Sequence, residues 1–519
     1  MNASPEQEVG IYSWFRRTAR RYPDLTALEV GNARISYAVL DGLAVRLATE
    51  IVNAAGGKPT AVGLCCSRSV AAYAGYLAAM RSGAPVVPLN PANPPARNGT
   101  ICAAAGVDVI VVDGTGGGAL PRTSAATVRL SDQDWWRHVT PADTSGAPPA
   151  PDPAEVAYIL FTSGSTGRPK GVPIQHAQLA DYVPYCARRY AVAPGSRLSQ
   201  TFDLTFDPSV FDMAVTWYGG GALVVPRPEE ILTPARFVEE RRISHWFSVP
   251  SVISLAGRLR GLRPASMPNL RWSLFAGERL TREQAREWAA AAPGSTIENL
   301  YGPTELTVTC TGYRLPADVG QWPRTPNGTL PIGRLYPHLE AVLLGEDGEW
   351  ARKGELCVRG SQRFAGYLDP ADNRHRFVRT RGSTSVPTET DWYRTGDLVC
   401  WQDGELVHLG RIDDQVKISG HRVEPDEIES VLRQHPAVHE AVVVPADDET
   451  AGTVLNALYT GSPVPEQALM AHCREQLPPY MVPAQVGYMA ELPLNTNGKI
   501  DRSRLRKLAA DDPRRARSG

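Results

Sequence analysis

The chain has 519 residues, more than one hydrophobic core usually supports, so two or more domains are expected. Its composition, 43% hydrophobic and 21% charged, is that of an ordinary globular protein and excludes a disordered one. With 54 basic and 55 acidic side chains the net charge is −1, so nothing suggests nucleic acid as a partner.

The N-terminus has no basic stretch followed by an apolar one, and no run reaches about 18 apolar residues. We therefore expect a soluble, cytoplasmic protein without a membrane partner. The eight cysteines form no CxxC pair, and the histidines do not cluster at zinc-binding spacing. Reduced, mostly buried thiols are the prediction.

The first 90 residues alternate between helical and extended patterns. Apolar residues recur at helical spacing over 11–21, 37–52 and 69–81, and residues 60–66 and 84–89 form apolar runs of strand length. This alternation predicts parallel sheets covered by helices. The Gly-, Pro- and Ala-rich residues 114–118 and 142–153 are predicted to be loops.

Residues 158–161 predict a buried strand that ends at a loop rich in Ser, Thr and Gly, residues 162–171. Glycines let backbone N–H groups approach an anion, hydroxyls add donors, and Lys170 adds a mobile charge. The loop therefore predicts a phosphate site, with a plain loop as the alternative. It is not a Walker A loop, because Lys170 lies between Pro169 and Gly171.

Asp207 lies among the apolar residues Phe206, Val210 and Phe211. A carboxylate in such surroundings is costly unless it is paired with a cation. This predicts a functional carboxylate. A helix N-cap is the structural alternative, and the local sequence does not separate the two.

Thr281 opens a capping box for a helix that runs to Ala292, and residues 295–299 predict the strand that follows. This strand runs into Tyr301-Gly-Pro-Thr-Glu305, at the edge where ligands bind in open α/β folds. Tyr301 could stack on a base, and Glu305 could hold a divalent cation beside phosphates. An ordinary turn is the alternative.

Further polar motifs occupy residues 354–360, 366–368, 393–398 and 410–424, and an apparent insertion at 379–390 is predicted to be a surface loop. After residue 412 the pattern changes to a small α+β unit. It predicts helices over 426–433 and 466–476, with strands over 440–444 and near 458. The last motif is Asn-Thr-Asn-Gly-Lys-Ile-Asp-Arg, residues 495–502.

From about residue 35 to 502, these motifs occur in the order and approximate spacing of the adenylate-forming superfamily, and the chain resembles a peptide-synthetase adenylation domain. Residues 162–171 resemble its nucleotide loop, and residues 301–305 match its Tyr-Gly-Pro-Thr-Glu signature. The resemblance implies an α/β fold with a large N-terminal region of stacked α/β subdomains plus a β subdomain. It also implies a small mobile C-terminal α+β lid. The expected domains are 1–411 and 412–519, with the hinge at Asp413.

The resemblance further implies ATP and Mg²⁺, and it assigns roles to residues at the matching positions. The residues that would hold the phosphates are Thr162, Ser163, Gly164, Ser165, Thr166, Gly167, Lys170 and Thr304. Those that would bind adenine and ribose are Asn299, Tyr301, Asp397 and Arg411. Glu305, with Thr162, would hold Mg²⁺. Lys499 would bridge the substrate carboxylate and the ribose oxygen, and an exposed turn lysine is the alternative.

Asp207 separates classes within the superfamily, because an amino acid brings an ammonium group that needs a partner, whereas fatty and aryl acids do not. It therefore favours an amino acid substrate. The other positions that line the substrate pocket by resemblance are uncharged: Pro208, Phe211, Ser248, Leu274, Ala276, Leu300, Gly302, Val308 and Thr309. They predict a small, mainly apolar amino acid. Similarity to proline-activating enzymes makes L-proline the first expectation, and other small aliphatic, hydroxylated or β-amino acids stay open.

The implied enzyme is a ligase of secondary-metabolite biosynthesis that forms aminoacyl-AMP, releases pyrophosphate and transfers the aminoacyl group to a phosphopantetheine thiol. The sequence shows no Gly-Gly-x-Ser attachment site after the lid, so a separate carrier protein is the expected partner. One rival is an acyl- or aryl-CoA ligase of the same fold, in which Asp207 only caps a helix. The other is a non-catalytic nucleotide-binding relative, against which Lys499, Glu305 and Asp397 speak.

Overall fold

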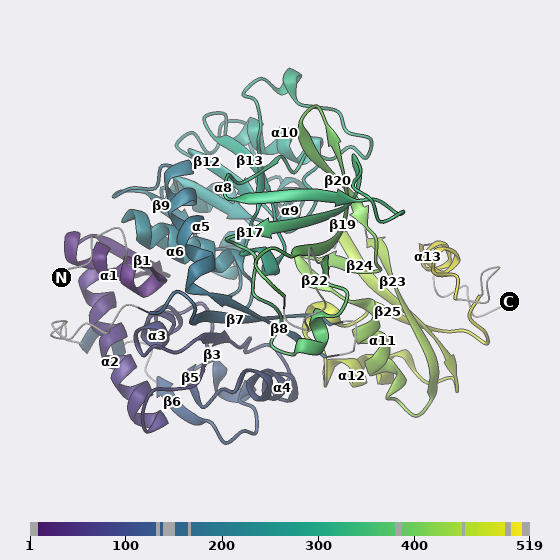
Figure 1. The fold of residues 1–519 in the computed structure, drawn as a ribbon, viewed down its shortest axis with the longest axis horizontal. Helices are drawn as coiled ribbons and strands as arrows, with labels where there is room; N and C mark the ends of the chain where they lie inside the picture. The colour runs from purple at the N-terminus through teal and green to yellow at the C-terminus, as the bar shows by residue number, and fades with distance from the viewer. Residues whose placement is uncertain are drawn as a thin grey trace.

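The computed structural model describes residues 9–130, 135–138, 151–164, 168–378, 387–448, 452–493 and 500–510. Figure 1 shows a large N-terminal part built from layers of helices and sheets, with a smaller C-terminal part at its right-hand side. This arrangement confirms the predicted α/β fold class, because both large sheets of the N-terminal part are mainly parallel.

One six-stranded sheet carries the predicted phosphate loop. Its strands are parallel except for the last, which pairs antiparallel with β7. Branched apolar residues fill its central strands, as expected for a parallel sheet covered on both faces. In spatial order the strands are β6 (Ala126–Leu130), β5 (Val109–Asp113), β3 (Val62–Cys65), β4 (Val86–Pro88), β7 (Val156–Thr162) and β8 (Lys170–Gln175).

A nine-stranded sheet forms the second layer. Its central strands are parallel, and antiparallel strands close both edges. In spatial order the strands are β15 (Arg334–Leu335), β14 (Thr311–Arg314), β13 (Thr296–Tyr301), β12 (Trp272–Phe275), β11 (His245–Ser248), β9 (Arg197–Ser199), β10 (Ala222–Val225), β1 (Thr26–Val30) and β2 (Ala33–Ser36). The carboxyl ends of β11, β12 and β13 meet at one edge, where the predicted substrate pocket lies.

Five helices pack between these sheets: α1 (Ile11–Arg21), α2 (Tyr37–Ala55), α3 (Val70–Arg81), α5 (His176–Arg189) and α6 (Pro208–Gly219). Helix α2 contacts β1 and β2 of one sheet and β5 and β6 of the other. Helix α3 is buried on nearly every side, which its almost uniformly apolar sequence explains. One continuous hydrophobic core therefore joins both sheets.

The remaining helices of the N-terminal part cover the outer faces. Helix α4 (Pro95–Ala105) packs on the six-stranded sheet through Ile101 and Cys102. On the nine-stranded sheet, Trp246 and Trp288 form the centre of a second core. The elements over that face are α7 (Pro228–Ile231), α8 (Pro234–Glu240), α9 (Ser251–Arg258) and α10 (Arg282–Ala291). Helix α10 begins at the predicted capping box, formed by Thr281 and Gln284.

A third, antiparallel sheet leads toward the C-terminal part and consists of β16 (Leu339–Leu344), β17 (Lys353–Gly360), β18 (Phe377–Val378), β19 (Trp392–Gln402) and β20 (Glu405–Arg411). The C-terminal part begins with the hairpin of β21 (Val416–Ile418) and β22 (His421–Val423). It continues with α11 (Pro425–Arg433), α12 (Glu466–Arg474), α13 (Arg502–Ala510) and a sheet of β23 (Val438–Asp448), β24 (Gly452–Gly461) and β25 (Gln485–Tyr488). Ile428, Val443 and Met481 belong to a hydrophobic core of its own.

Most predicted elements are confirmed within one to three residues at their ends, including the helices at 11–21 and 69–81. The predicted loop at 114–118 differs, because a short 3₁₀ turn spans Gly116–Ala119. Residues 142–150 and 379–386 lie outside the described part of the chain. All eight cysteines are free thiols, and all but the half-buried Cys400 are buried, as predicted.

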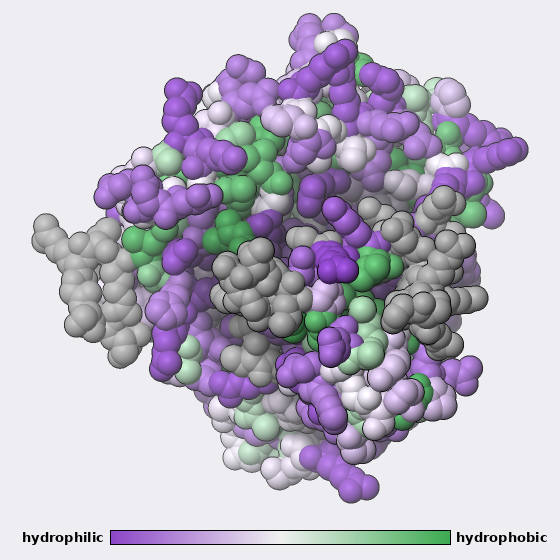
Figure 2. All heavy atoms as spheres, turned by 90° about the vertical axis from the view of Figure 1, so that its right-hand side faces the viewer, coloured by the Kyte–Doolittle hydropathy of each residue, from purple (hydrophilic) through white to green (hydrophobic). Residues whose placement is uncertain are grey.

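The surface gives no sign of an extended apolar region in the described residues. Large exposed apolar side chains, such as Leu259 and Trp350, are scattered. On the face that carries the C-terminal part, hydrophilic side chains dominate and hydrophobic ones form separate patches (Figure 2). Among the helices that the structure describes, none combines the length and apolar character needed to cross a bilayer.

Candidate active site

Asp397 lies at the centre of a buried network between β13, β19 and β20. Tyr301 donates its hydroxyl to Asp397 Oδ2 at 2.6 Å, Arg411 donates to Oδ1 at 3.0 Å, and His408 Nε2 lies 3.0 Å from the same oxygen. Burial opposes ionisation, but Arg411 and His408 hold the pKa of Asp397 well below its usual value. The structure therefore brings together the predicted residues Tyr301, Asp397 and Arg411, and it adds His408.

Asn299 lies on the same strand, two residues before Tyr301, and is buried. Its amide nitrogen donates to the backbone oxygens of Pro331 at 2.8 Å and Leu330 at 3.4 Å. These bonds fix the orientation of the amide beside Tyr301. The predicted adenine-binding pair is thus held rigidly on one strand end.

Glu305 follows in the short 3₁₀ turn Thr304–Leu306, and its side chain is completely buried. It accepts a hydrogen bond from Tyr367 at 2.5 Å and pairs with Arg422 at 3.0 Å. Burial raises the pKa of Glu305, but Arg422 and Tyr367 more than compensate, so its net pKa falls below the usual value. The predicted metal ligand is therefore an ionised carboxylate, and Arg422 of the C-terminal part is its counter-ion.

The described part of the phosphate loop also contacts the C-terminal part. Ser163 donates its hydroxyl to the backbone oxygen of Arg422 at 2.7 Å and accepts the backbone N–H of Glu424 at 3.1 Å. The backbone N–H of Gly164 donates to Glu427 at 3.2 Å. The O–H and N–H donors of the loop that could bind an anion are thus already bonded to acceptors in residues 422–427. The predicted residues Ser165, Thr166 and Gly167 lie outside the described residues.

Lys170 faces this loop from β8, directly across the ladder from Thr162. Its ammonium lies 3.5 Å from Asp372 and 5.7 Å from the centre of the Tyr367 ring. Burial lowers the pKa of Lys170, although Asp372 opposes that shift. A pocket of about 450 Å³ opens beside Lys170; it is also lined by Asp372, His375, Arg376 and the predicted hinge residue Asp413.

Asp207 precedes helix α6 and is only 5% exposed. It occupies the N-cap position, yet its side chain makes no capping hydrogen bond. Thr304 provides a side-chain hydrogen bond, whereas Oδ2 has no partner among the described residues. Burial raises the pKa of Asp207 to about 7, although the bond from Thr304 opposes the rise. The side chain of Asp207 is therefore buried without capping α6.

The other predicted pocket residues are buried around the carboxyl ends of β11, β12 and β13. Two of them have fixed polar partners: Thr309 shares hydrogen bonds with Tyr182 at 2.9 Å and Tyr336 at 3.0 Å, and Ser248 accepts from Trp246 at 2.9 Å. The uncharged set consists of Pro208, Phe211, Ser248, Leu274, Ala276, Leu300, Val308 and Thr309.

Gly302 and Val308 shape the backbone next to this pocket. A Cβ on Gly302 would lie 2.6 Å from the Cα of Thr309, so only glycine fits there. Thr307 and Val308 both adopt left-handed backbone conformations, with φ of 57° and 68°. Such strain in non-glycine residues is concentrated at functional sites.

The β21–β22 hairpin covers the site. His421 stacks on Tyr480 with ring centres 3.9 Å apart, and it also faces Phe206, next to Asp207, at 5.4 Å. Gly420 at the hairpin turn has φ of 82°, and a Cβ there would lie 2.6 Å from Val249. Desolvation lowers the pKa of the Lys417 ammonium, although Asp397 opposes that shift.

The sequence analysis did not assign roles to Arg422, Glu424, Glu427 or His408. A signal was present, because Arg422 and Glu424 belong to the motif 410–424 and the other two lie just outside it. Their contacts, however, depend on how distant segments of the chain meet. Lys499 lies outside the described residues, so its predicted position stays a prediction.

Comparison with known proteins agrees with this geometry. The family model described as AMP-binding enzyme matches residues 15–368, and the AMP-binding enzyme C-terminal domain matches residues 427–499. The chain is 35% identical over 518 residues to the phosphinothricin tripeptide synthetase PhsC of Streptomyces viridochromogenes. That match covers 96% of this chain and 45% of PhsC, so the chain spans less than half of this large synthetase.

Two similar proteins are covered almost completely. The L-proline--[L-prolyl-carrier protein] ligase of Pseudomonas fluorescens is 32% identical over 504 residues, which cover 93% of this chain and 96% of that protein. The crystal structure of the Vibrio cholerae adenylation domain AlmE in complex with glycyl-adenosine-5'-phosphate has a TM-score of 0.81 and 28% identity, and the match covers 99% of this chain and 100% of AlmE. These matches confirm the resemblance found in the sequence. The chain belongs to the family of AMP-binding enzymes, the adenylate-forming ligases.

Proposed function

We propose that this ligase activates an amino acid with ATP, forming aminoacyl-AMP and pyrophosphate, and then transfers the aminoacyl group to the phosphopantetheine thiol of a separate carrier protein. We place this reaction in secondary-metabolite biosynthesis. The observation that carries the proposal is Asp207, a buried carboxylate with one oxygen that has no partner among the described residues, while the other predicted pocket positions are uncharged. An ammonium group is the cation that such a carboxylate would pair with.

The missing capping bond also bears on the rival acyl- or aryl-CoA ligase. That rival explains Asp207 as a helix cap, yet the side chain caps nothing in α6. A simple acid would leave this buried carboxylate without a counter-ion, at a cost in free energy. The amino acid proposal gives the same carboxylate a function.

On the nucleotide side, we propose that Asn299 and Tyr301 frame the adenine and that Asp397 accepts the ribose hydroxyls, with Arg411 beside it. Because Arg411 keeps Asp397 ionised, its hydrogen bonds to hydroxyls would be charge-assisted and therefore strong. The ribose hydroxyls would compete with the Tyr301 hydroxyl for Oδ2. Ser163, Gly164, Lys170 and Thr304 would bind the phosphates, together with Ser165, Thr166 and Gly167.

We propose that Glu305, with Thr162, holds Mg²⁺ beside the phosphates. Its buried, ionised oxygens suit a hard cation, which typically uses one or two carboxylates plus substrate phosphates. No group of three or more His, Cys, Asp and Glu side chains comes together in the described ranges, so a self-sufficient metal cage is not found there. When bound, Mg²⁺ would neutralise charge on the phosphates. In the structure, the positive charge beside Glu305 is that of Arg422.

We further propose that the domain boundary falls at Ile412 and the hinge at Asp413. Ile412 is 53% exposed, and a separate hydrophobic core begins beyond it. Asp413 pairs with Arg411 at 2.6 Å, so the last residue of the N-terminal domain and the hinge are linked. Rotation here would withdraw Arg422 and the β21–β22 hairpin, freeing Glu305 and the loop donors, and would deliver Lys499 for the first half-reaction.

The substrate that we propose is a small, mainly apolar amino acid, with L-proline as the first candidate and other small aliphatic, hydroxylated or β-amino acids after it. The other predicted pocket positions are uncharged and offer no counter-ion to a charged substrate side chain. An ATP–pyrophosphate exchange panel over the amino acids tests this. Small uncharged amino acids should give the highest exchange, and preference for Asp, Glu, Lys or Arg would contradict the proposal.

A pH profile should report the ionisation of Asp207. Because its pKa is raised to about 7, the acid is neutral below that pH and cannot pair with an ammonium. We expect kcat/KM for the amino acid to fall about tenfold per pH unit below about pH 7 and to level off above it. The inflection should vanish from the residual activity of Asp207→Asn. An inflection that stays at the same pH in this variant would assign it to another group.

The raised pKa of Asp207 has the opposite effect on folding stability, which falls as the pH rises, whereas activity increases. The folded-state pKa lies above the ordinary value of 3.8, so the folded protein binds the extra proton between about pH 4 and 7. The contribution of Asp207 to stability is therefore lost as the pH rises through about 7. A bound ammonium would restore it.

A further inference from the structure

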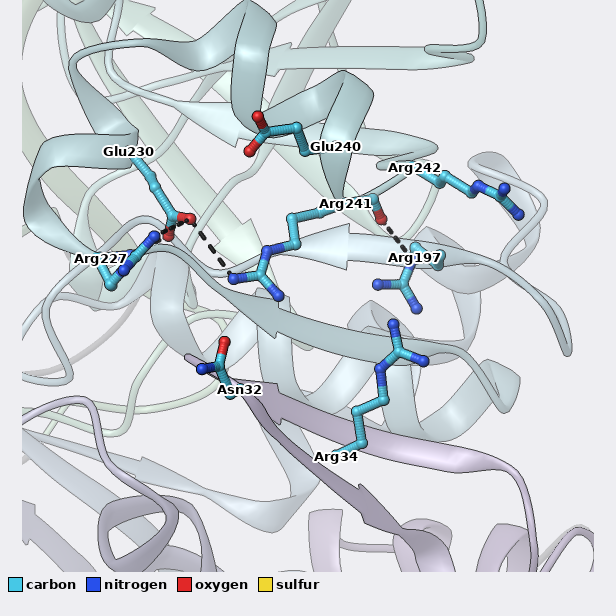
Figure 3. A pocket seen from close by; sticks show the side chains of 8 residues that line it. All are labelled: Asn32, Arg34, Arg197, Arg227, Glu230, Glu240, Arg241 and Arg242. Carbon is cyan, nitrogen blue, oxygen red and sulfur yellow. Dashed lines mark hydrogen bonds and ion pairs between the residues drawn. The ribbon is translucent and has the colours of Figure 1, made fainter.

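A second pocket, of about 760 Å³, lies on the nine-stranded sheet near its β2 edge and shares no residue with the active site. Figure 3 shows side chains that reach into it from β2, β9 and the ends of α7 and α8. Five of the eight lining residues are arginines. The lining consists of Asn32, Arg34, Arg197, Arg227, Glu230, Glu240, Arg241 and Arg242.

The floor of this pocket is an ion-pair network that holds its arginines in place. Glu29 is 2% exposed and accepts both terminal nitrogens of Arg197, at 2.6 and 3.1 Å. The Nε of Arg34 approaches Glu29 at 3.2 Å from the neighbouring strand. Arg197 also donates its Nε–H to the backbone oxygen of Arg241 at 2.6 Å, which ties the sheet to the end of α8.

The opposite wall is organised by Glu230, which pairs with Arg227 at 3.1 Å and with Arg241 at 3.5 Å (Figure 3). Glu240 also lines the pocket, but it pairs with Arg236 outside it at 2.7 Å. Five arginines thus face two glutamates, and the buried Glu29 neutralises one further charge. Arg227 also pairs with Glu229, which is not part of the lining, at 3.5 Å, so at least one positive charge remains uncompensated in this cavity.

The free donors point to a particular ligand chemistry. The Arg34 side chain is 74% exposed and uses only its Nε edge toward Glu29, and Arg242 has no side-chain hydrogen bond or ion pair with any described residue. Each guanidinium presents five N–H donors in a planar fork that suits phosphoryl oxygens. No aromatic or large apolar side chain is among the described residues that line the pocket, so nothing there would hold a base or an acyl chain.

We propose that this pocket binds a compact oligophosphate, an anion with two or more phosphoryl groups, through Arg34, Arg241 and their neighbours. The preassembled floor means that little side-chain order must be gained on binding. Inorganic pyrophosphate, tripolyphosphate and the tail of a nucleoside triphosphate share this chemistry.

Calorimetric titration of the full-length protein with sodium tripolyphosphate tests the proposal. The loop that we propose to hold the phosphates of ATP would also bind this probe, so Lys170→Ala is titrated in parallel. The tripolyphosphate binding that remains in Lys170→Ala is expected to come from the arginine pocket. We expect its affinity to fall by about tenfold or more when Arg34→Ala and Arg241→Ala are added to Lys170→Ala. It should also weaken as ionic strength rises, because Arg34 is exposed and salt screens exposed charges.

The matched control is Arg46→Ala, since Arg46 is also exposed, at 54%, and pairs with Glu50 on α2. It should leave tripolyphosphate binding unchanged at both the phosphate loop and the arginine pocket. The proposal would be overturned if, in the Lys170→Ala background, Arg34→Ala with Arg241→Ala gave the same titration curve as Arg46→Ala. It would also be overturned if Lys170→Ala alone bound no tripolyphosphate.

The variants and ligands can be varied without losing the test. If Arg34→Ala with Arg241→Ala does not fold by circular dichroism, Arg242→Asn replaces it, because Asn tolerates the left-handed φ of 50° at that position. Pyrophosphate or ATP that displaces tripolyphosphate from Lys170→Ala identifies the source of the anion. Displacement by sulfate at equal concentration would contradict recognition of linked phosphoryl groups.

Discussion

Asp207→Ala should strongly reduce amino-acid-dependent ATP–pyrophosphate exchange. Truncating one partner of a buried ion pair costs about 3–5 kcal/mol, because the other charge is left buried and unpaired. Here that other charge is the ammonium of the substrate. We expect kcat/KM for the amino acid to fall roughly 10²- to 10⁴-fold. Initial rates of exchange at varied amino acid concentration measure this.

The matched control lies five residues further along, inside helix α6. Asp212 is 1% exposed and neither of its carboxylate oxygens has a partner in the described residues, as at Asp207 Oδ2. Burial raises the pKa of Asp212 well above its usual value, which favours the neutral acid, and asparagine is a close isostere of that acid. Asp212→Asn should keep near wild-type exchange. An equal loss in both variants would indicate general damage to α6 rather than a lost charge pair.

Lys499→Ala should slow the first half-reaction far more than the second. An electrostatic contact made to the developing charge typically contributes about 10²–10³ in rate. We expect that loss in single-turnover formation of aminoacyl-AMP. Transfer to the carrier thiol should change much less, because the lid is proposed to rotate away from this position between the steps.

Lys507→Ala provides the control for this lid variant. Lys507 is exposed on α13, a few residues after the motif that contains Lys499. It should leave both half-reactions unchanged. The proposal that Lys499 acts in adenylation and lies away from the site during transfer would be wrong if Lys499→Ala slowed transfer from preformed aminoacyl-AMP as strongly as it slowed adenylation.

The sequence was sufficient to place residues that are distant along the chain but share one site. Tyr301 and Asp397 are 96 positions apart and meet at 2.6 Å, as the motif order implied. The sequence was not sufficient for Asp207, because a cap and a buried cation site have the same local pattern. Burial and the absent capping bond, which the sequence does not show, favour the cation site that we propose.

Other features depend on contacts that local patterns do not contain. The pairing of Arg422 with Glu305 requires the C-terminal part to lie against the core, and nothing in residues 410–424 specifies that position. Strands β1 and β2 were not predicted, because they are short and β1 pairs with β10, nearly 200 residues later. The arginine pocket is likewise assembled from several separate segments of the chain.

The most direct measurement removes each charge of the proposed pair in turn: the ammonium of the substrate and the carboxylate of Asp207. Pyrophosphate release is compared for the preferred amino acid and its analogue without the amino group, with wild-type protein and with Asp207→Ala. For proline the analogue is cyclopentanecarboxylic acid. Wild-type protein should prefer the amino acid by roughly 10²-fold or more, and Asp207→Ala should lose that preference or reverse it. An unchanged preference in the variant would show that the substrate's ammonium is recognised elsewhere.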